Sequence, residues 1–332
     1  MKNNICVKNY ESVLDVYDTE VAIKLVKDTF ERKLSERLDL VRVSAPLFVE
    51  PSTGLNDNLN GYEKAVSFVA MDDKVNLEIV QSLAKWKRNA LKKYGYDGIY
   101  TDMNAIRPFE DLDNLHSLYV DQWDWEKRIT KENRNEAYLK ETVKTIYKAL
   151  LDTYEVVVKA YPCLAIELPE EITFVTTEEL EKLYPNSSRK ERENEITKKY
   201  KAVFLMHIGD KLSDGLSHDG RAADYDDWHL NGDIILWYDV LNIAFELSSM
   251  GIRVDKDALL YQLHAKNEEF KLAFKYHQDI LNNNLPLSIG GGIGQSRICM
   301  YMLKKVHIGE VQASHWSDED IKELKKHNIH LL

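Results

Sequence analysis

The spacing of apolar residues along the chain predicts both helices and strands. In 130–159, apolar residues recur every three or four positions, which is the period of one face of an α-helix. These residues are Leu139, Val143, Ile146, Leu150 and Tyr154. In 231–249, a nearly continuous apolar run is broken only near 239–242, which indicates two buried strands joined by a short turn. Helix and strand patterns in one chain favour a mixed α and β fold.

The segment 98–125 has the pattern of a long antiparallel β-hairpin. Two strand-like stretches flank the turn-rich residues 108–114, and Arg107 lies at the inner edge of the hairpin. Alternate residues of the return strand share a face, which places Gln122 and Asp124 among apolar neighbours. An amide and a carboxylate on such a face are costly to bury without a partner. We therefore expect both to bind a polar ligand, with an exposed edge strand as the alternative.

The register of the two apolar strands brings acidic side chains together. With the turn at 239–242, Asp233 lies opposite Ser248. Ile235 then lies opposite Glu246, so Asp233, Glu246 and Ser248 share one face. Two carboxylates there suit Mg²⁺ that bridges nucleotide phosphates. The prediction depends on the register, because a shift of one residue moves each side chain to the other face. The alternative is structural, with Asp233 in a turn and Glu246 at a strand end.

Four glycines and one arginine occur together in 290–297, with the pattern G-x-G-x-G-x-x-R. An apolar stretch, 285–289, precedes them, and apolar residues at helical spacing follow in 296–305, so we expect a strand and then a helix. Glycine allows the backbone to approach a ligand, and arginine offers a planar fork of donors to phosphate. The order of residues fits neither a Walker loop nor a dinucleotide fingerprint. Taken alone, the pattern is equally compatible with a local turn.

Composition and charge indicate which kinds of partner the chain can bind. Its 332 residues are 44% apolar, which is enough for a large hydrophobic core, and a chain of this length can fold as one domain. The net charge of -11 disfavours nucleic acid and favours small substrates. Three distant cysteines indicate neither a disulfide framework nor a zinc site: Cys6, Cys163 and Cys299. The start lacks the apolar segment of a signal peptide, and no long apolar run predicts a membrane span, so we expect a cytoplasmic protein.

Three segments resemble the motifs of class II aminoacyl-tRNA synthetase catalytic domains. A helix and strand ending at Pro46 resemble motif 1, the Arg107 hairpin resembles motif 2, and the glycine-rich strand and helix resemble motif 3. Longer stretches resemble one family with this fold more closely, the ammonia-dependent asparagine synthetases, or aspartate-ammonia ligases. The stretches are 56–66, 82–88, 116–125, 245–255 and 290–297.

The resemblance implies an α+β fold with a central, mostly antiparallel sheet flanked by helices. It implies one catalytic domain over 1–332, with the three motifs at 19–46, 98–125 and 285–305. Motif 1 builds a two-fold interface in this class, so the resemblance also implies a homodimer. The expected small-molecule partners are L-aspartate, ammonia and ATP, with Mg²⁺ as the metal. Neither a nucleic acid nor a membrane is expected as a partner.

The resemblance also implies roles for individual residues. Catalysis falls to Arg107, Asp226 and Arg297, and the metal ligands are Glu246 and, with less support, Asp233. The nucleotide would contact Arg107, Ser117, Ser248, Gly292, Gly294 and Arg297. The aspartate pocket would contain Asp57, Ser82, Lys87, Gln122, Asp124 and Ser249. Three of these have structural alternatives, in a turn, at a helix cap and on a solvated helix face respectively: Asp57, Ser82 and Lys87.

The implied reaction makes L-asparagine through β-aspartyl-AMP and releases AMP and pyrophosphate. Asp226 or Asp57 would accept a proton from ammonium. One alternative is an aspartyl- or asparaginyl-tRNA synthetase, but no space is left for an anticodon-binding domain beside the motifs. The glycine motif also has Gln295 and Ser296 where synthetases commonly place an acid before the arginine. A catalytically silent regulatory paralogue is the other alternative, and loss of Arg107, Glu246 or Arg297 would have indicated it.

Overall fold

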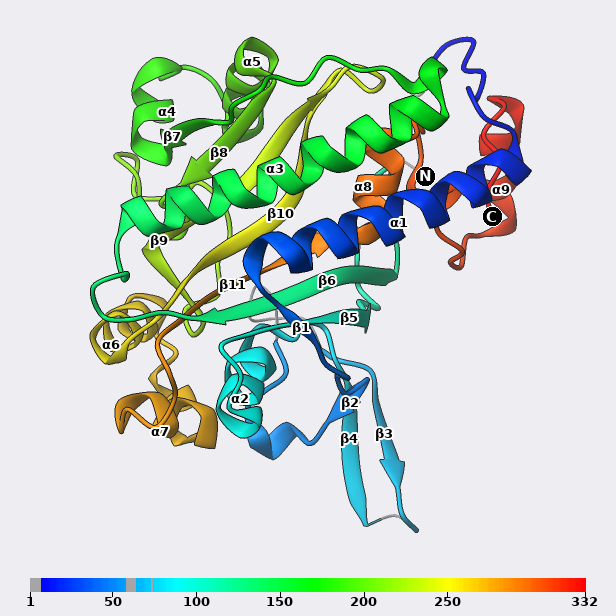
Figure 1. The fold of residues 1–332 in the computed structure, drawn as a ribbon. Coiled ribbons are helices and arrows are strands. Elements are labelled where there is room, and N and C mark those ends of the chain that lie inside the picture. Colours follow the sequence, from blue (N-terminus) through cyan, green and yellow to red (C-terminus); the bar gives the residue numbers. More distant parts are fainter. Residues whose placement is uncertain (1–6, 58–63, 73) are drawn as a thin grey trace.

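The structure is a computed structural model that describes residues 7–57, 64–72 and 74–332. Cys6 and part of the segment 56–66 lie outside these ranges. An eight-stranded sheet is the largest element of the described residues (Figure 1). Its strands, in spatial order, are β1 (Val41–Arg42), β5 (Gly98–Ile106), β6 (Tyr119–Arg128), β11 (Ser288–Gly294), β10 (Ile243–Arg253), β9 (Asp226–Tyr238), β8 (Ala202–Met206) and β7 (Thr173–Thr176).

Most neighbouring strands of this sheet run antiparallel, as predicted. The pairs at the two edges are parallel, β1 with β5 and β7 with β8, and the pairs between them are antiparallel. A second sheet of three short strands projects away from the first (Figure 1). It is formed by β2 (Phe48–Val49), β4 (Val75–Ile79) and β3 (Ser67–Ala70).

Two long helices cover one face of the large sheet, α1 (Val16–Leu38) and α3 (Glu136–Ala160) (Figure 1). The carboxylate of Asp15 accepts a hydrogen bond from the Asp18 N–H at 2.8 Å and caps α1, because the first N–H groups of a helix lack partners within it. Apolar residues from both helices and the sheet form the main core, in which the rings of Phe30 and Trp123 lie 4.9 Å apart.

The remaining helices lie around the edges and ends of the sheet. They are α2 (Ala84–Tyr94), α4 (Thr177–Leu183), α5 (Arg189–Tyr200), α6 (Lys256–Lys266), α7 (Lys275–Leu281), α8 (Gln295–Met302) and α9 (Asp318–Lys326). Short 3-10 turns occur at η1 (Pro51–Thr53), η2 (Pro162–Leu164), η3 (Glu269–Ala273) and η4 (Ile308–Glu310). Among the described residues, none of these helices combines the length and the apolar composition that a bilayer crossing requires.

The structure confirms most of the predicted elements, with one error of register. Ile235 pairs with Glu246 as predicted, but a β-bulge follows at Leu247. Asp233 therefore pairs with Ser249, so its predicted pairing with Ser248 is wrong. The bulge has a useful consequence: two adjacent serines, Ser248 and Ser249, both line the cavity on the face opposite α1 and α3.

Candidate functional site

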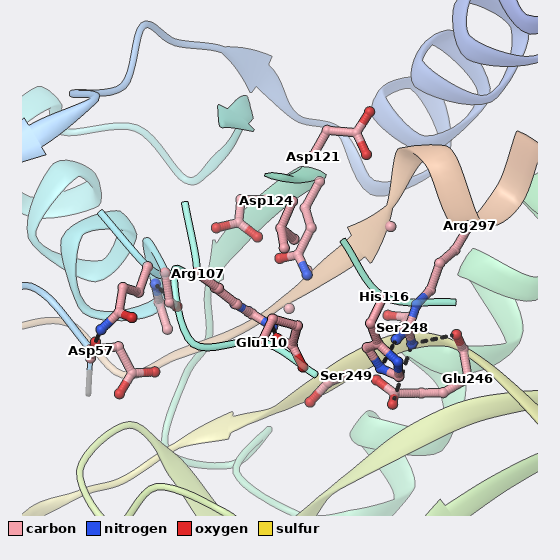
Figure 2. Close-up of a pocket in the computed structure, with 18 of the residues that line it drawn as sticks. Asp57, Arg107, Glu110, His116, Asp121, Asp124, Glu246, Ser248, Ser249 and Arg297 are labelled. Carbon is pink, nitrogen blue, oxygen red and sulfur yellow. Dashed lines mark hydrogen bonds and ion pairs between the residues drawn. The ribbon is translucent and has the colours of Figure 1, made fainter. Parts of the chain in front are cut away.

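A cavity of about 410 Å³ lies on the face of the large sheet that α1 and α3 leave uncovered. Strands β6, β10 and β11 supply its floor, and α2, α8 and the loop 219–226 contribute to its walls (Figure 2). All the predicted site residues except Asp233 line this cavity. They are Asp57, Ser82, Lys87, Arg107, Ser117, Gln122, Asp124, Asp226, Glu246, Ser248, Ser249, Gly292, Gly294 and Arg297.

The glycines of β11 make room for side chains from β6. A Cβ atom at Gly292 would lie 2.3 Å from Gln122 Oε1 and 2.7 Å from Asp124 Oδ1. At Gly290 it would lie 2.0 Å from Glu126 Oε2, which is closer than any real Cβ contact. The sequence predicted that these glycines lie against a nucleotide. The space they leave is occupied here by polar side chains of the neighbouring strand, and nucleotide contact with Gly292 and Gly294 stays a prediction.

A buried ion pair lies at one end of the cavity. Lys87 Nζ donates to the Gly291 carbonyl at 2.7 Å and lies 3.4 Å from Asp124 Oδ1, with the two side chains 2% and 3% exposed. Burial lowers the pKa of Lys87 and raises that of Asp124, because each loses more hydration than the partner restores. Within the described part of the chain, no hydrogen-bond donor reaches Asp124 Oδ2. A buried acceptor without a partner indicates a place for a polar ligand.

Asp226 is held by a buried arginine that the sequence did not single out. Arg253 donates to Glu126 Oε2 at 2.7 Å through Nη2 and also binds Asp226 Oδ1 through Nη1. Ser288 Oγ donates to Glu126 Oε1 at 2.7 Å. The Asp226 carboxylate is therefore oriented by Arg253, which in turn is anchored to β6 and β11. No local motif marks this contact, since Arg253 and Glu126 are 127 residues apart in the chain.

Asp57 lies beside a second buried group of charges. The carboxylate of Asp224 is 3.1 Å from Lys85 Nζ and 3.0 Å from His277 Nε2. Burial raises the pKa of the Asp57 carboxyl, and the positive charge of Lys85 opposes that rise. Ser82 Oγ accepts from the Ala84 N–H at 3.2 Å. Ser82 thus contacts the first residue of α2, but the N-cap of this helix is Leu83 and not Ser82, and Ser82 lines the cavity.

Arg297 lies at the other end of the cavity in a network that Figure 2 shows. Its Nη1 donates to the Glu246 carbonyl at 2.9 Å and lies 3.5 Å from Glu246 Oε2. Its Nη2 lies 2.9 Å from His116 Nε2, and His116 Nδ1 lies 2.9 Å from Asp113 Oδ1. A guanidinium group has donors only. His116 must therefore accept through Nε2 and carry its proton on Nδ1, toward Asp113.

Arg107 enters the same cavity from another side (Figure 2). It follows β5 directly, and its backbone N–H donates to the Leu118 carbonyl at 2.8 Å, which fixes the start of the hairpin connection. Its Nη1 lies 3.9 Å from Glu110 Oε2, too far for a hydrogen bond, and its Nε meets no acceptor among the described residues. The guanidinium is thus available to a ligand. Two arginines from separate motifs share one cavity, as the predicted mechanism requires.

The two predicted metal ligands differ in their surroundings. Asp233 lies beside the cavity lining, where its Oδ1 accepts from Arg221 Nη2 at 2.7 Å, and Arg221 also binds Ser249 Oγ. Burial and the charge of Glu246 raise the pKa of Asp233 to about 7, against the effect of Arg221. For Glu246, enclosure by the cavity alone would raise the pKa, but Arg297 and Arg221 hold it below its usual value. Arg221 was missed because it belongs to a loop without a motif.

Glu246 fits a nucleotide-bound Mg²⁺ better than Asp233 does. Its side chain is 43% exposed and faces the cavity, whereas Asp233 is committed to Arg221. Across the described ranges, three His, Cys, Asp or Glu side chains never come together as a complete metal site. Mg²⁺ commonly needs only one or two carboxylates when substrate phosphates and water supply the other ligands. The donor set is compatible with that arrangement.

Comparison with solved structures defines the class of fold. Asparaginyl-tRNA synthetase from Entamoeba histolytica, in complex with asparaginyl-adenylate, aligns with a TM-score of 0.65 at 12% identity, over 90% of this chain and 66% of that one. The asparaginyl-tRNA synthetase of Pyrococcus horikoshii, with the same adenylate, gives 0.64 at 14% identity, over 89% and 68%. The fold is that of a class II aminoacyl-tRNA synthetase catalytic domain.

Sequence comparison then identifies the family. The sequence model of the aspartate-ammonia ligase family matches residues 17–328. An aspartate-ammonia ligase from Fusobacterium nucleatum is 60% identical over 326 residues, which cover 97% of this chain and 99% of the relative. One from Clostridium tetani is 58% identical over 322 residues, covering 96% and 94%. The chain belongs to the aspartate-ammonia ligase family.

Proposed function

We propose that the chain catalyses ATP-dependent synthesis of L-asparagine from L-aspartate and ammonia, through β-aspartyl-AMP, with release of AMP and pyrophosphate. The relatives named above carry the name of this activity. The observation that supports it most directly is one cavity containing Arg107, Arg297 and the carboxylate oxygen of Asp124 that no described donor reaches. Such a cavity can hold a polyphosphate at one end and an amino acid at the other.

The first step would activate the β-carboxylate of aspartate. A carboxylate is a poor electrophile, and adenylation gives it AMP as a leaving group. This step needs neutralised charge rather than a nucleophilic side chain. Arg107 would bind the α-phosphate and the attacking carboxylate together. Its guanidinium lacks a close carboxylate acceptor among the described residues, which leaves its donors for that contact.

The opposite end of the nucleotide would be held by Arg297 and Glu246. Arg297 would bind the terminal phosphates, with its orientation set by His116 and the Glu246 carbonyl. The carboxylate of Glu246 would hold Mg²⁺, which when bound offsets the negative charge of the phosphates. Ser117 and Ser248 would line the same end. Gly292 and Gly294 would contact the nucleotide, and Asp233 would assist Glu246 from beside the cavity.

The aspartate would lie over β6 and β11. Asp124 would accept the α-ammonium group of the substrate, because its Oδ2 is a buried acceptor without a donor in the described part of the chain. Lys87 and Gln122 would bind substrate carboxylate or amide oxygen, together with Ser82 and Ser249. In the second step, Asp226 or Asp57 would bind ammonium and accept its proton before the amine attacks the adenylate. Arg253 binds Asp226 Oδ1 and so holds this carboxylate in one orientation.

A homodimer built on α1 is part of the proposal. Several large apolar side chains just before and at the start of this helix are exposed, and a second copy of the chain would cover them. They are Val13, Val16, Tyr17 and Val21.

One experiment tests the proposed activity against a tRNA synthetase. The purified protein is incubated with aspartate, ATP, Mg²⁺ and ¹⁵N-ammonium, and the products are measured by mass spectrometry. We expect labelled asparagine, AMP and pyrophosphate in equal amounts. A parallel reaction with tRNA measures aminoacylation. Formation of aspartyl-tRNA without labelled asparagine would overturn the proposal, and ADP in place of AMP would overturn the adenylate step.

A further inference from the structure

We propose that Asp121 is a positioning residue that holds the first turn of α8, and with it Arg297, in place for the nucleotide. The inference rests on the proposed role of Arg297 in binding ATP. Asp121 belongs to β6, two residues away from Trp123 in the main core, and points toward α1 rather than into the middle of the cavity (Figure 2). Asp121 also lines the cavity, but both of its carboxylate oxygens are bound by Ser296, Gln312 and Lys27, so its role is to position these neighbours.

The carboxylate of Asp121 binds the start of α8 at two points. Its Oδ1 accepts from the Ser296 backbone N–H at 3.1 Å, and its Oδ2 accepts from Ser296 Oγ at 2.8 Å. Both side chains are buried. Helix α8 begins at Gln295, so Ser296 lies in its first turn and Arg297 follows directly. A carboxylate that fixes Ser296 at two atoms also fixes the direction in which the Arg297 side chain leaves the helix.

Gln312 connects the contact between Asp121 and Ser296 to Ser117 at the nucleotide end of the cavity. Its Nε2 donates to Asp121 Oδ1 at 3.2 Å and to Ser296 Oγ at 3.0 Å. Its Oε1 lies 2.5 Å from Ser117 Oγ. Since His116 precedes Ser117 and binds Arg297, the contacts form a closed ring. The ring links the hairpin connection to the helix that carries the second arginine.

The contact between Asp121 and Ser296 explains why the glycine motif can lack an acid before its arginine. In the synthetase form of the motif an acid commonly precedes the arginine, and here Ser296 occupies that place. The structure supplies an acid from β6 instead, because Asp121 binds Ser296 through both carboxylate oxygens. The negative charge is kept at the start of α8, where it also interacts favourably with the helix dipole.

Lys27 connects the same carboxylate to α1. Its Nζ lies 3.0 Å from Asp121 Oδ2, and the pair is largely shielded from solvent. The ion pair compensates the buried charge of Asp121, which would otherwise be costly. It also means that α1, the helix proposed to form the dimer interface, contacts the residue that positions Arg297.

The test compares variants by the KM for ATP and the KM for aspartate in pyrophosphate exchange. Asp121→Ala should raise the KM for ATP at least about tenfold and leave that for aspartate within about twofold, since a charge-assisted contact is lost only at the nucleotide end. Asp121→Asn should have an intermediate effect, because an amide oxygen can still accept from the Ser296 N–H. Asp102→Asn is the matched control. Asp102 accepts from the Gln295 side chain at 3.1 Å but does not line the cavity, and both KM values should stay unchanged.

A double variant separates positioning from general damage to the fold. In Asp121→Asn, the new amide N–H₂ faces the Lys27 ammonium group. Both groups are hydrogen-bond donors, so they cannot bind each other. Adding Lys27→Met should remove this conflict and return the KM for ATP toward that of the unchanged protein. Additive losses in the double variant, or equal increases in the two KM values, would overturn the inference. The proposed function fails separately, if the unchanged protein makes no asparagine.

Discussion

The two ends of the cavity differ in how far their charged side chains are already paired. At the end proposed to bind aspartate, called the aspartate end below, Lys87 and Asp124 are 2% and 3% exposed, and Asp226 is bound to buried Arg253. At the end proposed to bind the nucleotide, called the nucleotide end, the side chains of Arg107 and Arg297 are 23% and 21% exposed. Their distances to the nearest carboxylates, 3.9 Å and 3.5 Å, are longer than good hydrogen bonds.

The difference shows that the fold prepares the two ends in different ways. Contacts between neighbouring strands hold the side chains of the aspartate end in place. This end can therefore select a substrate by its shape and by the donors that it offers to unpaired acceptors. At the other end, the Arg107 guanidinium has no close acceptor among the described residues, whereas Arg297 donates to the Glu246 carbonyl and to His116. Bound phosphates would take up the first and compete for the second. Removing a charge should therefore reduce stability at the aspartate end and mainly reduce catalysis at the nucleotide end.

The largest effect on catalysis should follow from Arg107→Ala. The variant loses a cation that acts where charge develops during adenylation, so aspartate-dependent ATP-pyrophosphate exchange should fall by about 10²- to 10³-fold. The unfolding free energy should change by less than about 1 kcal/mol, because the side chain is partly exposed and weakly paired. Exchange at the normal rate would remove Arg107 from the proposed mechanism.

The largest effect on stability should follow from Lys87→Met. The variant leaves Asp124 buried without its cation, and the unfolding free energy measured in urea should fall by about 3 to 5 kcal/mol. Arg297→Met serves as the matched change at the other end and should cost less, about 1 to 2 kcal/mol, because it loses two hydrogen bonds but leaves no buried charge unpaired. Similar losses of stability for the two variants would contradict the contrast between the ends.

A smaller, substrate-specific effect should follow from Gln122→Ala. The side chain lies over Gly292 in the aspartate end and offers one neutral hydrogen-bonding group. Its loss should raise the KM for aspartate by up to about tenfold and leave ATP binding unchanged. Steady-state kinetics with each substrate varied in turn give the two values. Equal losses for aspartate and ATP would show that Gln122 is not specific to the amino acid.

The change in pH dependence caused by Asp233→Asn is a separate effect on stability. A carboxyl group with a raised pKa in the folded state takes up protons on folding, so its contribution to stability falls as pH rises from about 4 to about 7. The variant lacks this titration. Between these pH values the unchanged protein should lose stability relative to the variant, by up to about 4 kcal/mol. If the unfolding free energies of the two proteins changed with pH in the same way, Asp233 would have an ordinary pKa.

The sequence predicted the elements that local patterns determine. Alternation along β6 correctly placed Gln122 and Asp124 on one face, because side-chain direction in a strand depends only on its neighbours. Contacts that join distant segments could not be predicted in this way. Leu247 lies between Glu246 and Ser248 in a strand without glycine or proline at that point, so no local signal marks its bulge. Arg221 lies outside any motif, and the stretch 245–255 that contains Arg253 does not reveal its partners, because only the folded sheet brings the two arginines to the predicted carboxylates.

The glycines of β11 also limit how this enzyme can change its substrate. Any side chain at Gly290 or Gly292 would collide with Glu126, Gln122 or Asp124, so saturation mutagenesis of this strand should yield almost no active sequences. Variants that accept a different acid should arise instead at other positions that line the cavity, on α2, β6, β10 or the loop 219–225. Engineering and natural divergence therefore have the same restricted set of positions to work with.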